Sequence, residues 1–142
     1  MSYKSYQISS DKWLLVGSFL LIFGTFLPWY DFRWEAEIPW TGIEFSGIVY
    51  GYSLLLGQIF IVLAAILAVL VLIPHREEFK SKMFQGQMFV GSLIVLIYLI
   101  NILFHPIFLV PAVLPHAGIW VLLIGCISII YGLGKLYRSL QQ

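Results

Sequence analysis

Two histidines and four acidic residues are the side chains in this sequence best suited to binding a metal ion. His105 and His116 flank a proline-rich segment, and the acidic residues are Asp31, Glu35, Glu37 and Glu44. Two imidazoles and a carboxylate can bind zinc or iron. Their spacing matches no ligand motif, however, and each histidine stands beside a proline. We therefore predict no metal and no cofactor, and His105 and His116 remain the candidates for a membrane metal or haem protein.

A second group of polar residues recurs at helical spacing near the middle of the sequence. Steps of four, seven, three and four positions connect Gln87, Gly91, Tyr98, Asn101 and His105. Such steps place side chains on one face of a helix, which we call the polar stripe. Within a membrane, amides face protein or water rather than lipid. The stripe therefore predicts either interhelical hydrogen bonds, with Asn101 bonding to Ser18, Thr25 or Gln58, or a path for a solute. We favour hydrogen bonding because the predicted helices carry no acid or base at mid-membrane depth.

The remaining sequence offers little chemistry for an enzyme. It contains no pairing of a nucleophile with a base, no phosphate-binding loop and no paired buried carboxylates. Cys126 is the single cysteine, which excludes an internal disulfide, and we interpret it as a small packing residue. The net charge of +1 gives no basic patch for nucleic acid. We therefore expect a protein that is not an enzyme.

The composition places the chain among membrane proteins. Hydrophobic residues make up 61% and charged residues 11% of the 142 residues, and the mean hydropathy is +0.94. Soluble domains are about 45–50% apolar and about 25% charged. The apolar runs predict four transmembrane helices at about residues 12–28, 53–73, 83–104 and 117–137, in one membrane domain covering residues 1–142. Ser9, Ser10 and Asp11 are typical N-cap residues before the first helix, which Pro28 ends.

The segment between the first two helices has the pattern of a β-hairpin. Apolar and charged residues alternate from Tyr30 to Ile38, which is the period of a strand with one dry face. We predict an extracytoplasmic hairpin over residues 29–49, with paired strands at 29–38 and 43–49. Its side chains facing the bundle or membrane should be Phe32, Trp34 and Phe45. The proline-rich segment 105–116 should lie at the same side, folded onto the bundle without a regular helix.

Small residues recur at heptad spacing in three of the predicted helices. We predict that these glycines let helices pack closely, as small residues do in membranes. They are Gly17 and Gly24 in the first helix, Gly57 in the second, and Gly118, Gly125 and Gly132 in the fourth.

The distribution of cations predicts the orientation. With both termini in the cytoplasm, seven of the eight lysines and arginines lie inside, and Arg33 alone lies outside. Cytoplasmic loops carry an excess of these residues. The hairpin has one cation against four acids, a net charge of −3. We therefore expect an integral protein of a bacterial inner (plasma) membrane, with the lipid bilayer and other membrane subunits or further copies of itself as partners.

The first helix ends in a recognisable motif, Gly24-Thr25-Phe26-Leu27-Pro28-Trp29, and residues 47–51 lead into the second. This pattern resembles a broad group of small, uncharacterised bacterial four-helix membrane proteins with Leu-Pro-Trp at the end of the first helix. The plan also resembles claudins in topology only, because the paired cysteines and Gly-Leu-Trp of the claudin loop are absent.

The sequence thus predicts an all-α membrane protein, a four-helix bundle with an outer hairpin. We expect it to be a non-catalytic accessory or structural subunit of a membrane complex. The alternatives are a small oligomeric channel or transporter that uses the polar stripe, and a metal or haem protein that uses His105 and His116.

Overall fold

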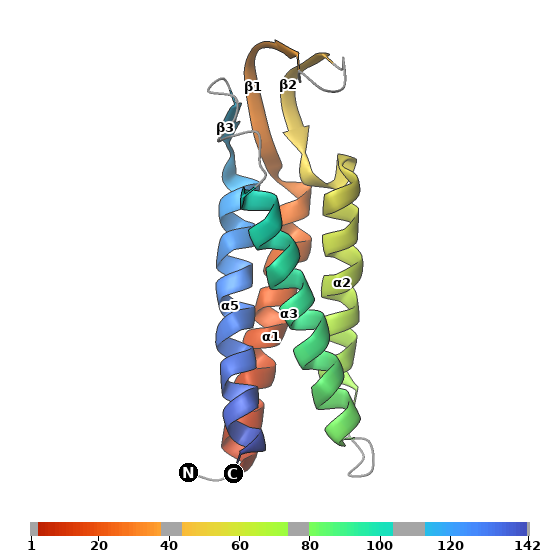
Figure 1. Cartoon of the computed structure of the whole chain (residues 1–142), viewed down its shortest axis with the longest axis vertical. Helices are drawn as coiled ribbons and strands as arrows, with labels where there is room; N and C mark the ends of the chain where they lie inside the picture. The colour runs from red at the N-terminus through yellow and green to blue at the C-terminus, as the bar shows by residue number, and fades with distance from the viewer. Residues whose placement is uncertain (1–2, 38–43, 74–79, 104–112, 142) are drawn as a thin grey trace.

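The computed structural model describes residues 3–37, 44–73, 80–103 and 113–141. This part of the chain contains the helices α1 (Tyr3–Phe26), α2 (Leu55–Leu72), α3 (Lys80–Leu103) and α5 (Ala117–Leu140), with the short 3-10 helix η1 (Gly51–Ser53) before α2. The strands are β1 (Pro28–Glu37), β2 (Glu44–Tyr50) and β3 (Val113–Pro115). The helices form an elongated bundle, the sheet rises from one end, and both termini lie at the other end, which we call the inner end (Figure 1).

Local sequence explains where the helices stop. α1 ends at Phe26 because Pro28 disfavours helical geometry at Leu27. α2 ends at Leu72, shortly before Pro74. α1 begins at Tyr3, nine residues before the predicted start at residue 12. No proline or glycine interrupts residues 3–12, so Ser9 to Asp11 continue the helix instead of capping it.

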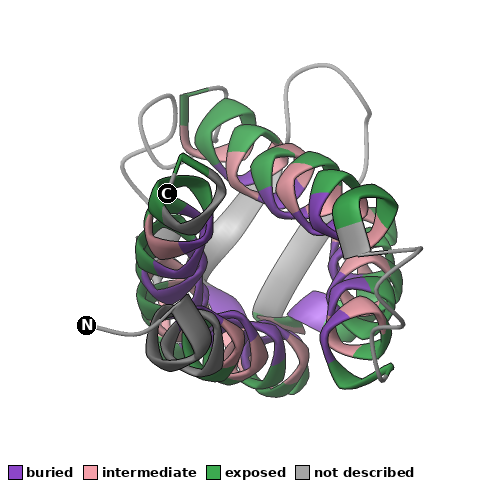
Figure 2. Ribbon diagram, turned by 90° about the horizontal axis from the view of Figure 1, so that it is seen from below, coloured by how far each residue is buried: buried purple, intermediate pink, exposed green. Residues whose placement is uncertain are grey.

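The four helices surround a common core. α1 packs against α5 and α2, and α3 completes the ring by packing against α2 and α5. The buried faces point inward and the exposed faces outward around this ring (Figure 2). Large side chains fill the interior, among them Leu14, Leu21, Phe60, Ile94 and Ile129. The predicted helical bundle is therefore confirmed in the described part of the chain.

The outer surface of the bundle carries many large apolar side chains. Leu55 is 74% exposed, Phe89 70% and Phe19 63%. Within the described residues, three helices are long and apolar enough to cross a membrane, at Leu55–Leu72, Ser81–Leu103 and Ala117–Arg138. An apolar exterior and helices of this length are consistent with an integral membrane protein.

The predicted hairpin is present. β1 pairs antiparallel with β2, with Tyr30 opposite Val49 and Phe32 opposite Gly47, and the register shifts between Phe32 and Ala36. The pairing brings together two segments that are close in the sequence, as antiparallel strands can be. The side chains of Phe32, Trp34 and Phe45 lie outside the described part of the structure, so the predicted direction of these rings stays a prediction.

The proline-rich segment departs from the prediction. Its last residues, Val113–Pro115, form β3 and pair antiparallel with β1, which gives a sheet in the order β2-β1-β3. Residues 113–115 therefore extend the sheet as its third strand. Proline is tolerated at the edge of a sheet because its missing N–H is not needed there for a ladder hydrogen bond. Residues 104–112, which include His105, lie outside the described residues.

Candidate functional site

The indole of Trp29 occupies the centre of the contact between the helices and the sheet. This side chain is only 1% exposed, and its Nε1 donates a hydrogen bond to the carbonyl oxygen of Gly24, 3.0 Å away. Its ring lies edge-on to the rings of Tyr30 and Phe60, with centroids 6.2 and 6.3 Å away. Pro28 ends α1 directly before Trp29, and the turn there directs the indole back into the bundle. The donor is thereby satisfied where little water is present.

Two glycines make room for this indole. A Cβ placed on Gly118 would lie 2.5 Å from Cδ1 of Trp29 and 2.8 Å from the carbonyl oxygen of Pro28. A Cβ on Gly51 would overlap the indole ring. Gly118 comes from α5 and Gly51 from η1, so the ring is held between elements from both halves of the chain. We call the group Trp29, Tyr30, Gly51, Asn101 and Gly118 the junction.

Backbone hydrogen bonds tie further segments to the junction. The backbone amide of His116 donates a hydrogen bond to the carbonyl oxygen of Trp29, 2.8 Å away. The backbone amide of Gly51 donates one to the carbonyl oxygen of Leu27, 3.4 Å away. The end of α1, the start of α5 and the turn before α2 are thereby joined at one level. Helix ends leave backbone groups without helical partners, and these bonds satisfy some of them.

The described members of the polar stripe bond to three different elements. Gln87 Nε2 donates to the carbonyl oxygen of Leu70 on α2 over 3.0 Å. The hydroxyl of Tyr98 donates to that of Ile119 on α5 over 3.3 Å. The side chain of Asn101 shares a hydrogen bond with the hydroxyl of Tyr30 on β1. α3 is thus fastened to α2, to α5 and to the sheet by side chains from one of its faces.

The partners predicted for Asn101 are engaged elsewhere. Ser18 Oγ donates to the carbonyl oxygen of Leu14 over 2.9 Å, and Thr25 Oγ1 donates to that of Ile22 over 2.6 Å. Gln58 Nε2 donates to the carbonyl oxygen of Tyr52 over 3.4 Å. The hydroxyls are taken by backbone carbonyls of their own helix, which is common for Ser and Thr in helices. Asn101 finds Tyr30 instead, a residue that the sequence pattern assigned only to a strand.

Burial gives Tyr30 a strong preference for its neutral form. Removal from water raises the pKa of its hydroxyl, the nearby Tyr98 hydroxyl adds to the rise, and the hydrogen bond with Asn101 opposes it. Loss of solvation disfavours the charged phenolate. At neutral pH Tyr30 is therefore an uncharged member of the junction.

The predicted packing glycines lie at close contacts, with different neighbours. A Cβ on Gly17 would be 2.8 Å from the carbonyl oxygen of Gly125, and one on Gly24 would be 3.3 Å from that of Gly118. A Cβ on Gly132 would lie 2.9 Å from Leu14 Cδ2. α1 and α5 therefore touch along a line of small residues, the α1–α5 seam. Gly57 lies against the backbone of Gly51 in η1 rather than against another helix.

Among the described residues, His116 belongs to no group of side chains that could hold a metal ion. The backbone of His116 stands at the N-cap of α5, and its side chain makes no capping hydrogen bond. Within residues 3–37, 44–73, 80–103 and 113–141, no group of three His, Cys, Asp or Glu side chains is placed to hold a metal ion. His105 lies outside these ranges, so the metal hypothesis stays a prediction.

A shallow groove of about 240 Å³ lies on the outside of α2, lined by Gln58, Ile59, Val62 and Leu63. Its walls are almost entirely apolar and come from α2 alone.

Comparison of the chain with protein-family models, curated proteins and solved structures gives no match.

Proposed function

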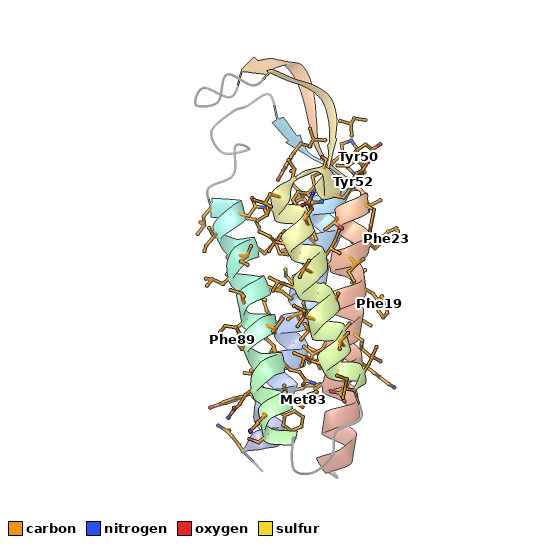
Figure 3. All side chains as sticks on the ribbon, turned by 90° about the vertical axis from the view of Figure 1, so that its right-hand side faces the viewer. Phe19, Phe23, Tyr50, Tyr52, Met83 and Phe89 are labelled. Carbon is orange, nitrogen blue, oxygen red and sulfur yellow. The ribbon has the colours of Figure 1, made fainter. Side chains whose placement is uncertain are left out.

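We propose that this chain crosses the membrane four times and serves as a non-catalytic accessory or structural subunit of a membrane complex. The fourth span would be α1. α1 follows α5 along the α1–α5 seam, and α5 is itself long and apolar enough to cross. Phe19 and Phe23 of α1 are 63% and 60% exposed, and they point away from the bundle (Figure 3). Large apolar side chains on that surface favour contact with lipid over contact with water.

The charges support an orientation with the sheet outside and both termini in the cytoplasm of a bacterial cell. Lys12, Lys82, Lys135 and Arg138 belong to the parts of α1, α3 and α5 nearest the inner end. The sheet contains four acidic residues and one arginine. Because cations are retained on the cytoplasmic side, the inner end should face the cytoplasm.

The accessory role rests on one observation, that the side chains of the polar stripe form hydrogen bonds to neighbouring elements of the bundle. Its three described polar side chains, Gln87, Tyr98 and Asn101, each bond to a different neighbouring element. A conduction path instead needs polar groups that can replace the hydration shell of a solute. Groups already bonded to α2, α5 and β1 hold the bundle together, which is the property expected of a structural subunit.

The outer surface offers a place for protein or lipid contacts. Phe26 stacks on Tyr52 with ring centroids 5.9 Å apart, and Tyr52 lies 5.8 Å from Tyr50. The rings of Phe19, Phe23, Tyr50 and Tyr52 lie along one side of the bundle, from its middle to the base of the sheet (Figure 3). Tyrosine is enriched both at membrane interfaces and at protein contacts. Other membrane subunits, or further copies of this chain, are the partners we propose.

The test compares assembly with activity. Tagged protein is extracted in mild detergent, co-purifying proteins are identified, and the growth or solute-flux phenotype of the cells is recorded. Gly125→Leu should abolish assembly, because a Cβ there already lies 3.2 Å from the carbonyl oxygen of Gly17. Gly134→Leu is the matched control, because nothing lies within 4 Å of a Cβ at that position. Asn101→Leu should leave both assembly and phenotype nearly unchanged.

The channel hypothesis predicts a different result for the same variants. If the polar stripe conducts a solute, Asn101→Leu should assemble normally and yet lose flux. That outcome would reject the accessory role and would identify the stripe as a path. Purification without any partner, and without self-association, would reject the structural role as well.

A further inference from the structure

One face of α5 changes its chemistry in a regular order along the helix. Steps of four, three, four, four and three positions connect Trp120, Ile124, Ile127, Tyr131, Lys135 and Arg138. These steps keep the six side chains on one face, which we call the α5 stripe. Trp120, Ile124, Ile127 and Tyr131 are 50% to 56% exposed, Lys135 is half-buried and Arg138 is exposed. The stripe is therefore accessible and runs from apolar, through aromatic, to cationic.

Contacts at the inner end position the cationic part. The ammonium of Lys135 lies 4.8 Å from the centre of the Tyr131 ring, a cation–π contact. Trp13 from α1 meets the same ring edge-on, with centroids 5.0 Å apart and an interplanar angle of 79°. The ammonium is thus held at the level of two rings that suit the boundary between headgroups and hydrocarbon. Arg138 lies three residues further along, about 4.5 Å along the helix axis.

We propose that the α5 stripe binds one anionic phospholipid. The phosphate would lie between Lys135 and Arg138, and an acyl chain would follow Ile127, Ile124 and Trp120. Eleven residues separate Trp120 from Tyr131, which is about 16 Å of helix and matches much of an acyl chain. A free phosphate would use only the cationic end, whereas a phospholipid uses the whole stripe.

The local charge favours an anion. By sequence, the inner halves of α1 and α5 contain Lys4, Lys12, Lys135 and Arg138 against Asp11, which is a net charge of +3. Lys82 stands at the inner end of α3 and is also exposed. Lys82 lies off the α5 stripe. A variant at Lys82 therefore distinguishes binding at a specific site from the general attraction between cations and an anionic membrane. The proposal does not depend on the accessory role.

The experiment counts lipids that stay bound to purified protein by native mass spectrometry. Protein in detergent is mixed with phosphatidylglycerol or, separately, with phosphatidylcholine. The wild type should retain one phosphatidylglycerol in preference to phosphatidylcholine. Lys135→Gln and Arg138→Gln should each weaken this retention roughly fivefold, since one cation near an anionic surface is worth about that factor. Lys82→Gln should retain the lipid like the wild type.

Two further measurements test whether the bound group is a phospholipid or free phosphate, and whether each variant is folded. Inorganic phosphate at millimolar concentration should not displace the lipid, and displacement would indicate an ordinary anion site. The thermal midpoint in detergent should match the wild type for Arg138→Gln, which is the deciding variant if Lys135→Gln is unstable. Equal retention of both lipids, unchanged retention in folded Arg138→Gln, or an equal loss in Lys82→Gln would each overturn the proposal.

Discussion

The junction and the inner end of the bundle are held together in different ways. At the junction, directional hydrogen bonds join α1, β1, α3 and α5, for example from His116 to Trp29 and between Asn101 and Tyr30. Toward the inner end, Gln87 bonds α3 to α2, while close apolar contacts join α1 and α3 to α5. Two of those contacts bring Leu14 against Gly132 and Leu133 against Gly91.

The difference follows from where the backbone leaves its helical hydrogen bonds. Within a membrane helix, each internal backbone group has a partner in the same segment, so helices can pack through shape alone. At the junction α1 stops, a strand starts and α5 begins, and the freed groups must find partners away from water. Directional bonds also fix the orientation of the sheet, which close packing alone would leave less well defined. Changes to the buried indole of Trp29 and to Gly118 beside it should therefore affect stability most.

Removal of the indole should have the largest effect. Trp29→Ala deletes a side chain that is 1% exposed and removes the hydrogen bond from its Nε1 to the carbonyl oxygen of Gly24. We expect a loss of about 3–5 kcal/mol in the free energy of unfolding, as for other large buried aromatic residues. Denaturation in detergent measures it. The control is Trp120→Ala, because Trp120 is 55% exposed, and its effect should stay within about 0.5 kcal/mol. Equal losses of unfolding free energy in the two variants would show that the junction does not contribute more to stability than the exposed surface does.

The glycine beside the indole should come next. Gly118→Ala places a methyl group 2.5 Å from Trp29 and 2.9 Å from the carbonyl oxygen of Gly24, so α1 and α5 must separate. Overpacking of this kind costs about 1–3 kcal/mol. Gly134→Ala on the same helix meets no neighbour and should be neutral or slightly stabilising, because alanine favours helices. A neutral Gly118→Ala would mean that the two helices do not touch there.

Tyr30 should make stability depend on alkaline pH. Its pKa is raised in the folded protein, so above the ordinary tyrosine value of about 10 the unfolded chain loses a proton that the folded chain keeps. The free energy of unfolding should therefore fall as the pH rises past about 10 and be unaffected near neutrality. Tyr30→Phe removes this contribution and should flatten the decline. Parallel curves for the two proteins between about pH 9 and about pH 11 would contradict a buried, neutral Tyr30.

Much of the fold follows from local patterns. Long apolar runs predicted the helices, and the alternation from Tyr30 to Ile38 predicted the hairpin, because both signals depend on neighbouring residues. The pairing of β3 with β1 was missed because it joins Val113–Pro115 to residues more than eighty positions earlier. Three prolines in the segment 105–116 also argued against regular structure.

The junction illustrates the same limit for side chains. The Leu-Pro-Trp motif marked Trp29 in the sequence, but nothing there indicated that Gly51 and Gly118 would enclose its ring. The hydrogen bond between Asn101 and Tyr30 depends on the position of α3 along the bundle axis relative to the sheet. The spacing of residues in the sequence predicts which side chains share a helix face but does not predict that position. The available signal for a buried polar partner was the position of Tyr30, just beyond Pro28, where the predicted first helix ends.

Above all, we propose that the polar stripe fastens neighbouring elements together. A double-mutant cycle on Tyr30→Phe and Asn101→Leu tests it most directly, with unfolding in detergent measured for the wild type, both single variants and the double variant. We predict a coupling of about 0.6 kcal/mol, the typical value for side-chain hydrogen bonds in membrane proteins. Effects that add to within about 0.3 kcal/mol would show that the two side chains do not interact, and would contradict the claim.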